Sequence, residues 1–276
     1  MAFQLHLVSD STGETIGAVA RACLAQFEGT DITEHVWNLV RTPRQLKTVI
    51  AGIQENPGLV LYTFVDEELR ETLEEACRAD KISCVSVLKP VLHGMVDLFG
   101  HKPTHMPGKQ HSLDESYFAR IDAMDFAMAQ DDGHGIERLR DADVVILGVS
   151  RTSKTPTCIY LAGRGIRAAN IPIVPGIPLP FDIDTLKKPL VVGLTKDPDS
   201  LIAIRRSRLH LLSEKRDTAY VDPEKVRAEV MEARRFFARI GCPIIDVSRR
   251  SIEETAAEIM MLLAKKKESS AQLSIL

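Results

Sequence analysis

An eight-residue segment, Gly148 to Thr155, most constrains what this 276-residue chain can fold into. It reads Gly-Val-Ser-Arg-Thr-Ser-Lys-Thr and follows the apolar run 142–147, which is typical of a buried strand. Pro156 and a helix-like stretch come directly after it, and proline is well tolerated in a first helical turn. A strand, a tight loop, Lys-Thr and a helix in this order predict a phosphate-binding P-loop.

The residue types of this loop suit such a site. Backbone N–H groups would wrap a polyphosphate, Lys154 would supply a positive charge, and the Thr155 hydroxyl would ligate Mg²⁺. We therefore predict that the whole loop binds the nucleotide, through Gly148, Val149, Ser150, Arg151, Thr152, Ser153, Lys154 and Thr155.

The loop departs from the standard pattern G-x-x-x-x-G-K-[ST] at one position, because Ser153 stands where the second glycine is expected. That glycine normally allows the backbone to approach the phosphates closely, and serine is small enough to serve. The alternative is an ordinary strand-to-helix turn with a capping Ser or Thr. Against this alternative, a lysine in a first helical turn is electrostatically unfavourable unless an anion binds there.

The composition predicts a protein with two globular domains. Hydrophobic residues make up 45% and charged residues 26% of the chain, which is ordinary for such proteins. The net charge of −3 gives no overall nucleic-acid-binding signature. We expect no membrane span and no signal peptide, since no apolar run is long enough and the N-terminus lacks the pattern. Five widely spaced cysteines without a C-x-x-C predict reduced thiols and a cytoplasmic protein.

Strand-like and helix-like segments alternate in the first half, which predicts a parallel α/β domain. Strands are expected at 3–8, 33–39, 59–65 and 82–88, and helices up to 27, over 43–54, over 67–79 and over 113–130. The segment 90–112 contains three prolines and is expected to be a loop. Its four histidines lack carboxylate or cysteine partners at ligand spacing, so we do not expect a metal site there.

The polar, glycine-rich segment 131–135 predicts the domain boundary. An N-terminal α/β domain would cover 1–132, and a C-terminal P-loop kinase-like α/β domain would cover 133–276. In the second half, strands are expected at 171–175, 190–194 and 243–247, helices over 199–212 and 223–240, and a last helix opening at a Ser251 capping box. The tail from 265 is expected to fray, and no internal repeat is evident.

Phosphoryl transfer needs further charged groups beside the loop. Arg205, on a predicted helix, would fold over the phosphates, or else belong to a solvated basic face. A carboxylate is needed to hold Mg²⁺ or to accept a proton, and the candidates are Asp182, Asp197 and Asp246. We favour Asp246, because it follows the apolar residues 243–245 as a Walker B aspartate would; a local strand-end role is the alternative. We therefore predict Lys154, Arg205 and Asp246 as the catalytic residues.

Two other segments were weighed as nucleotide contacts. The turn 9–15 follows a strand and opens a helix, so its N–H groups could meet an anion or could simply cap the helix. Thr195-Lys196-Asp197-Pro198 approaches the guanine-reading pattern N-K-x-D but ends in proline. The motif set of eukaryotic-type protein kinases is absent as well. The sequence therefore indicates a kinase of another fold.

The nine residues from Gly148 to Pro156 resemble the nucleotide loop of the bacterial and plant regulatory proteins of pyruvate, phosphate dikinase and of phosphoenolpyruvate synthase. Three further segments, 9–15, 192–205 and 246–255, are similar to the same family and follow in the expected order. The resemblance covers nearly the whole chain. Serine before the lysine and proline after the threonine make the loop more specific than a generic P-loop.

This resemblance implies a bifunctional enzyme. Such proteins use ADP to phosphorylate a threonine near the catalytic histidine of the target, which inactivates it, and they remove that phosphate with inorganic phosphate, releasing pyrophosphate. Pyruvate, phosphate dikinase is the favoured target and phosphoenolpyruvate synthase the alternative, with the N-terminal domain serving for target docking or for a homodimer. A P-loop kinase of a small metabolite and a non-catalytic nucleotide sensor remain the other classes.

Overall fold

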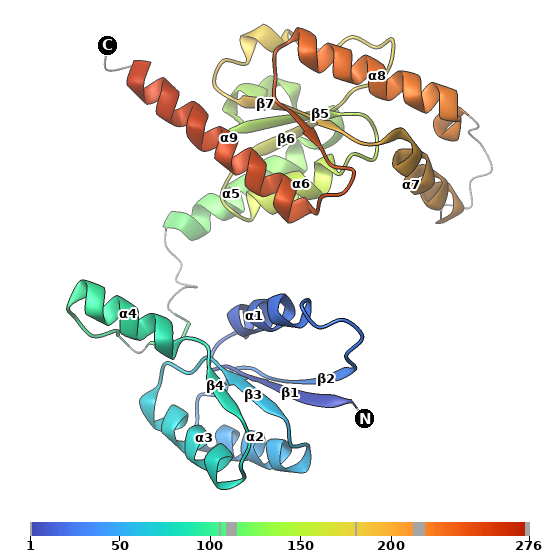
Figure 1. Cartoon of the computed structure of the whole chain (residues 1–276). Coiled ribbons are helices and arrows are strands. Elements are labelled where there is room, and N and C mark those ends of the chain that lie inside the picture. Colours follow the sequence, from blue (N-terminus) through green and yellow to red (C-terminus); the bar gives the residue numbers. More distant parts are fainter. Residues whose placement is uncertain (1, 105, 109–114, 180, 212–218, 274–276) are drawn as a thin grey trace. The chain divides into compact units, whose positions relative to one another are not determined.

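The computed structural model consists of two compact units, Met1–Ser112 and Leu113–Leu276 (Figure 1). It describes residues 2–104, 106–108, 115–179, 181–211 and 219–273. Each unit contains one parallel sheet of four strands with helices on both faces. The predicted class, two α/β domains, is confirmed.

The predicted domain boundary at residue 132 falls inside the second unit. The physical reason is helix α5 (Glu115–Ala129), which precedes that boundary in the sequence. α5 buries Ala123 and Ala127 in the core of the second unit. The glycine-rich segment 131–135 therefore forms a turn within the second unit and not a domain boundary.

The first unit is built on a sheet with the strand order β2-β1-β3-β4, all parallel. Its strands are β1 (Phe3–Val8), β2 (Ile32–Trp37), β3 (Leu59–Tyr62) and β4 (Cys84–Ser86). Helix α1 covers one face, and helices α2 and α3 cover the other (Figure 1). Their bounds are α1 (Glu14–Leu24), α2 (Pro43–Glu55) and α3 (Glu67–Ala79).

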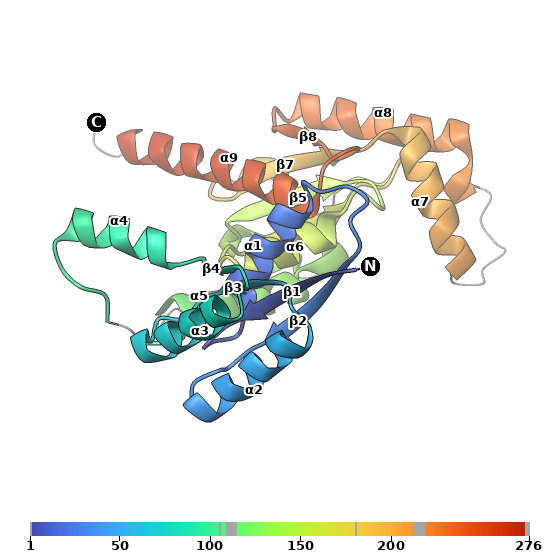
Figure 2. The same ribbon diagram turned by 60° about the horizontal axis from the view of Figure 1, so that its bottom comes forward.

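A fourth helix, α4 (Lys89–Phe99), occupies a segment that we predicted to be a loop (Figures 1 and 2). Pro90 lies in its first turn, where the missing N–H removes no intrahelical hydrogen bond. Gly100 ends the helix in the left-handed conformation. The loop prediction was wrong for this segment: prolines at 90, 103 and 107 favoured a loop, but Pro90 sits in a first helical turn, which accepts proline.

The second unit repeats the topology of the first. Its sheet has the strand order β6-β5-β7-β8, so the first strand of each unit lies between the second and the third. The strands are β5 (Val144–Gly148), β6 (Ala168–Pro172), β7 (Leu190–Thr195) and β8 (Ile244–Asp246). The sequence gives no sign of this repeat, because the two units share a strand order without an evident residue pattern.

Helices cover both faces of the second sheet (Figure 1). One core lies under α5, α6 and α9, and the other lies under α7 and α8. Their bounds are α6 (Lys154–Ala162), α7 (Pro198–Leu211), α8 (Pro223–Arg239) and α9 (Ile252–Leu273). Short 3₁₀ turns are η2 (Asp131–Gly133), η3 (Ile136–Asp141), η4 (Ile183–Thr185) and η5 (Ala219–Val221). All five residues of β5 are buried, as its apolar run predicts.

The last helix begins as predicted but ends later. Ser251 and Glu254 form the predicted capping box, with Glu254 N–H donating to Ser251 Oγ at 3.1 Å and Ser251 N–H to Glu254 Oε2 at 2.8 Å. The helix then continues past residue 265, where we expected fraying. Lys266 holds this part, because its ammonium donates to the carbonyl oxygen of Pro189 at 2.6 Å.

We expect Gly193→Ala, in the middle of β7, to destabilise the protein. A Cβ atom there would lie 2.5 Å from the ring of Phe237, a fully buried residue of α8. Overpacking of this kind costs about 1–3 kcal/mol. The matched control is Gly94→Ala on α4, whose new methyl group would meet nothing within 4 Å and should stabilise the helix. Urea unfolding followed by far-UV circular dichroism measures both, and a Gly193→Ala midpoint equal to wild type would contradict the packing described.

Candidate active site

The loop after β5 has the predicted strand–loop–helix geometry. β5 ends at Gly148, and α6 begins at Lys154. Ser153 adopts the left-handed conformation with φ 62°, which is the conformation that the expected glycine would take most easily. Its side chain makes no capping hydrogen bond, so the alternative of a helix-capping serine at this position is wrong. Gly148 is required for close packing, because a Cβ there would lie 2.6 Å from Thr152 Oγ1.

Lys154 is buried by the loop that precedes it. Its side chain is only 6% exposed, and its ammonium donates to the carbonyl oxygen of Val149 at 3.1 Å. Burial lowers the pKa of Lys154 to about 8, while the carboxylates of Asp132 and Asp131 oppose that shift. Within the described residues, no carboxylate forms an ion pair with this ammonium. The protein therefore holds a buried positive charge that its own side chains neutralise only from a distance.

A pocket of about 540 Å³ opens beside this ammonium. It is lined by Asp132, Ser150, Arg151, Ser153, Lys154, Thr155, Pro156, Pro172 and Ile204. Its volume lies within the range of ordinary small-molecule sites. Five of the eight predicted nucleotide contacts thus face one cavity, at the carboxyl edge of the sheet where ligands of open α/β folds bind.

Thr155 belongs to a polar cluster that we define by Asp131, Asp132, Thr155 and Asn170. The Thr155 hydroxyl donates to Asp131 Oδ1 at 2.9 Å. Asn170 Nδ2 lies 3.0 Å from Thr155 Oγ1 and also donates to Asp131 Oδ1. Neither aspartate was predicted as a site residue, because 131–135 has the composition of a domain boundary. A polar asparagine inside the buried strand β6 was the signal available.

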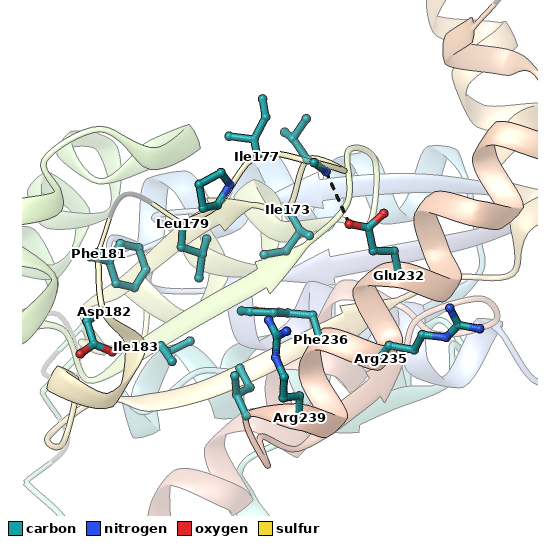
Figure 3. A pocket seen from close by; sticks show the side chains of 14 residues that line it. Ile173, Ile177, Leu179, Phe181, Asp182, Ile183, Glu232, Arg235, Phe236 and Arg239 are labelled. Atoms are coloured by element: carbon teal, nitrogen blue, oxygen red, sulfur yellow. Dashed lines mark hydrogen bonds between the residues drawn. The ribbon is translucent and has the colours of Figure 1, made fainter.

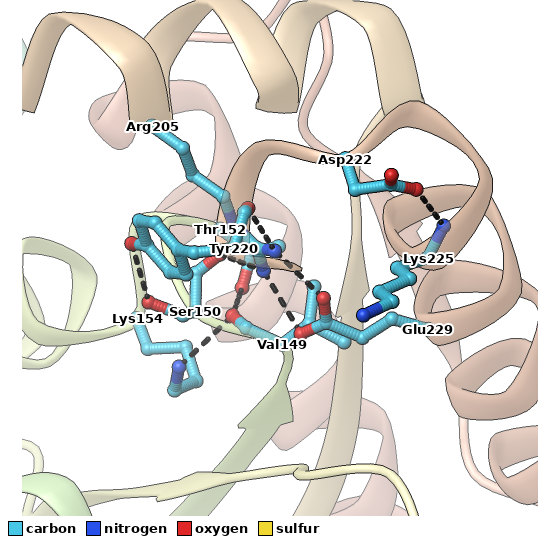
Figure 4. Close-up of polar contacts among 9 residues, drawn as sticks. All are labelled: Val149, Ser150, Thr152, Lys154, Arg205, Tyr220, Asp222, Lys225 and Glu229. Atoms are coloured by element: carbon cyan, nitrogen blue, oxygen red, sulfur yellow. Dashed lines mark hydrogen bonds and ion pairs between the residues drawn. The ribbon is translucent and has the colours of Figure 1, made fainter. Parts of the chain in front are cut away.

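Arg205 is not at the pocket where we predicted it. It is 1% exposed, and its guanidinium forms two hydrogen bonds with Glu229, at 2.7 and 2.8 Å (Figure 4). It also donates to the carbonyl oxygens of Ser150 and Tyr220 at 3.1 and 3.2 Å and packs on the Tyr220 ring. Arg205 therefore ties the loop to α7, α8 and η5, which is a positioning role.

Asp246 has partners of its own at the end of β8. It ends β8 as expected, but there it pairs with Arg234 at 3.2 Å and accepts a hydrogen bond from the Ser248 N–H at 2.9 Å. It is exposed and is not among the residues that line the pocket. The structure thus favours the alternative of a local strand-end role. Of the other candidates, Asp197 accepts from the Ser200 N–H at the start of α7.

Lys196 is a second buried lysine, and we did not predict it as a site residue. It follows β7, whose Leu194 pairs with Gly148 of β5, so it extends the same edge of the sheet. It is 9% exposed, and within the part of the chain that the structure describes it has no ion-pair partner. The partial match of 195–198 to a guanine-reading motif gives no sign that this lysine is buried.

A family model described as kinase/pyrophosphorylase matches residues 5–260. The chain belongs to the kinase/pyrophosphorylase family. The matched range therefore includes most of both structural units and all residues that line the pocket beside Lys154.

Relatives in this family share about half of the sequence. A relative from Paramagnetospirillum magneticum is 56% identical over 260 residues, which cover 94% of this chain and 84% of the relative. One from Rhodospirillum rubrum is 55% identical over 259 residues, covering 94% of each. One from Novosphingobium aromaticivorans is 51% identical over 267 residues, covering 97% and 95%. All three bear the provisional name pyruvate, phosphate dikinase regulatory protein.

The first unit of this family member holds a smaller pocket of about 180 Å³ at the turn 9–15. Ser9 and Asp10 are buried there and are already paired, since Ser9 Oγ accepts from Thr63 at 3.0 Å and Asp10 from the Val65 N–H at 2.8 Å. Burial raises the pKa of Asp10. The helix α1 that follows begins at a left-handed Gly13 without a side-chain cap. No side chain of this turn caps α1, so the alternative that the turn serves only as a helix cap is not supported.

A larger groove of about 730 Å³ lies between α8 and the segment that follows β6 (Figure 3). Apolar side chains such as Ile173, Leu179 and Phe236 form its walls, and Glu232 accepts from the Gly176 N–H at 3.5 Å. Of the predicted carboxylates it contains only Asp182. Asp182 and Lys154 thus line different pockets.

In the described residues, no group of three His, Cys, Asp or Glu side chains could hold a metal ion by itself. His105 and His111 lie outside the described residues. Within the same residues, no helix is long and apolar enough to cross a membrane. The five cysteines are free thiols.

We expect Arg205→Ala to destabilise the protein by about 3–5 kcal/mol, because it leaves the mostly buried Glu229 carboxylate without its partner. Arg227→Ala is the matched control, since it breaks an exposed ion pair with Asp199 between the same two helices and should cost less than about 1 kcal/mol. Urea unfolding distinguishes the two. Equal effects of both substitutions would contradict the anchoring role of Arg205.

Proposed function

We propose that this protein is a bifunctional regulator of pyruvate, phosphate dikinase. It would use ADP to phosphorylate a threonine of the dikinase, which inactivates the target, and would use inorganic phosphate to reverse the modification. The family description, which combines a kinase with a pyrophosphorylase, and the names of the relatives support this proposal.

The observation that carries the proposal is the buried, distantly compensated ammonium of Lys154 beside a pocket of about 540 Å³. Phosphoryl transfer depends mainly on positioning and on stabilising negative charge, and a desolvated cation interacts strongly with an anion that enters the pocket. The loop N–H groups would bind the ADP phosphates and Thr155 would ligate Mg²⁺. Arg205 would act indirectly, by holding the carbonyl of Ser150 in place.

One site can serve both directions. In the forward reaction the threonine hydroxyl attacks the β-phosphorus of ADP, the bond to the bridging oxygen breaks, and AMP leaves. In the reverse reaction inorganic phosphate attacks the phosphothreonine, and the threonine oxygen leaves while pyrophosphate forms. Both transition states carry negative charge on the equatorial oxygens of the transferred group, and Lys154 would stabilise that charge in each case.

The names of the relatives favour the dikinase over phosphoenolpyruvate synthase as the target. The experiment is incubation of the protein with ADP labelled in the β-phosphate, Mg²⁺ and purified dikinase, followed by phosphoamino-acid analysis. Label on a dikinase threonine is the expected result. Label only on the synthase would change the target; transfer to a small molecule would indicate a metabolite kinase, and binding without transfer a nucleotide sensor.

Replacing Lys154 with alanine should lower the rates of both reactions by at least about 100-fold, because both transition states lose the same stabilising charge. Lys188→Ala, which removes an exposed lysine of the same unit, is the control and should leave both rates unchanged. The two rates are measured from labelled ADP and from labelled phosphodikinase with inorganic phosphate. Full phosphorolysis by Lys154→Ala would refute the single site.

The depressed pKa of Lys154 predicts a pH dependence of ADP binding. Lys154 is protonated below about pH 8 and loses its charge above it, so ADP affinity should fall as the pH rises through that value, by at most about tenfold per pH unit. Lys154→Arg keeps its charge throughout and should show a flatter profile, even if it binds more weakly. Calorimetric titrations between about pH 7 and 9 measure this, and an equally steep fall in Lys154→Arg would show that another group titrates.

A further inference from the structure

The polar cluster beside Lys154 contains a buried oxygen atom that the protein leaves unpaired. Asn170 is 1% exposed, and its Nδ2 contacts Thr155 Oγ1 and Asp131 Oδ1. Its Oδ1 has no hydrogen-bond partner among the described residues. A buried amide oxygen without a partner is costly, and a ligand or ion at the cluster would offset that cost.

Asp132 brings a second carboxylate to the same place. It lines the pocket together with Lys154 and Thr155. Its backbone has φ 50° and ψ 36°, a left-handed conformation that residues with a side chain adopt at a cost. The chain accepts this strain at the residue whose carboxylate faces the proposed phosphate site, and strained residues cluster at functional sites.

Two carboxylates beside a site for phosphates create a conflict of charge. Like charges a few ångströms apart repel. A divalent cation between them removes the conflict, because it attracts both the carboxylates and the phosphates. The oxygen atoms of the cluster, from carboxylate, hydroxyl and amide groups, are those that Mg²⁺ prefers.

We infer that Asp131, Asp132 and Thr155 form the protein side of a divalent-cation site that accepts Mg²⁺ together with ADP. The inference rests on the proposed function, since it takes ADP to be the ligand of this pocket. In P-loop enzymes the loop Ser or Thr shares Mg²⁺ with an aspartate from a neighbouring strand end. Here the hydrogen bond from Thr155 to Asp131 gives that role to a residue before β5, and Asp246 does not take it.

The test compares the affinity of the full chain for ADP in Mg²⁺ and in EDTA by calorimetry. Wild type should bind ADP more tightly in Mg²⁺. In Asp131→Asn and in Asp132→Asn that gain should fall by about 10–100-fold, while affinity in EDTA should stay the same or rise because a negative charge is gone. Asp141→Asn, which removes an exposed carboxylate of the same unit, should keep the full gain.

A second readout needs no nucleotide. Mn²⁺ binding to the free protein, followed by electron paramagnetic resonance, should weaken in both variants and not in Asp141→Asn. An unchanged Mg²⁺ gain and unchanged Mn²⁺ binding in the variants would overturn the inference. Wild-type ADP binding that is equal in Mg²⁺ and EDTA would also overturn it, together with the proposed role of Thr155 as a Mg²⁺ ligand, but would leave the proposed use of ADP standing.

Failure of wild type to bind ADP would instead refute the proposed function, and the Mn²⁺ titration would still decide the cation site. Circular dichroism checks that each variant folds. If Asp131→Asn does not fold, the exposed Asp132 carries the test, because its side chain contributes nothing to the core.

Discussion

The burial of one ammonium group, that of Lys154, organises the second unit. Removing this charge from water is costly, which lowers the pKa of Lys154, and the hydrogen bond to the carbonyl oxygen of Val149 offsets part of that cost. Asp131 and Asp132 lie close enough to favour the charged form but too far away to pair with it. The ammonium of Lys154 can therefore interact with an incoming anion, whereas a direct ion pair with an aspartate would already neutralise its charge.

Contacts with other segments of the second unit hold the loop around Lys154 in its conformation. Arg151 and Ser153 both adopt left-handed conformations that a free loop would seldom hold. The buried guanidinium of Arg205 holds the carbonyl of Ser150 while its charge is met by Glu229. A buried ion pair of this kind adds little net stability, but it fixes a single arrangement because each partner is costly to leave unpaired.

The sequence predicted features that depend on local pattern. Apolar runs marked the strands of both sheets, and the succession of strand, loop and Lys-Thr marked the candidate site. What it missed depends on long-range contacts. From the sequence, Asp131 belongs to a predicted domain boundary, but in the fold β6 places Asn170 beside it. Arg205 was predicted to contact phosphates, but in the fold Glu229 of α8 pairs with it. The residue type shows which interactions a side chain can make, but only the packing shows whether another side chain of the protein already makes them with it.

The two units have the same strand order but carry different side chains at the equivalent loops. In each unit, the loop after the first strand lies at the carboxyl edge, where the strand order reverses and ligands of α/β folds bind. The loop of the second unit carries Arg151 and Lys154, whereas the turn 9–15 of the first carries Asp10 and Glu14 and no lysine or arginine. A cation within the loop would stabilise the charge of a transferred phosphoryl group, and only the loop of the second unit carries one; in the first unit the nearby Arg41 donates to the carbonyl oxygen of Asp10 at 2.8 Å. The same backbone architecture therefore offers two edges, and the charges within the loops favour the second for the proposed phosphoryl transfer.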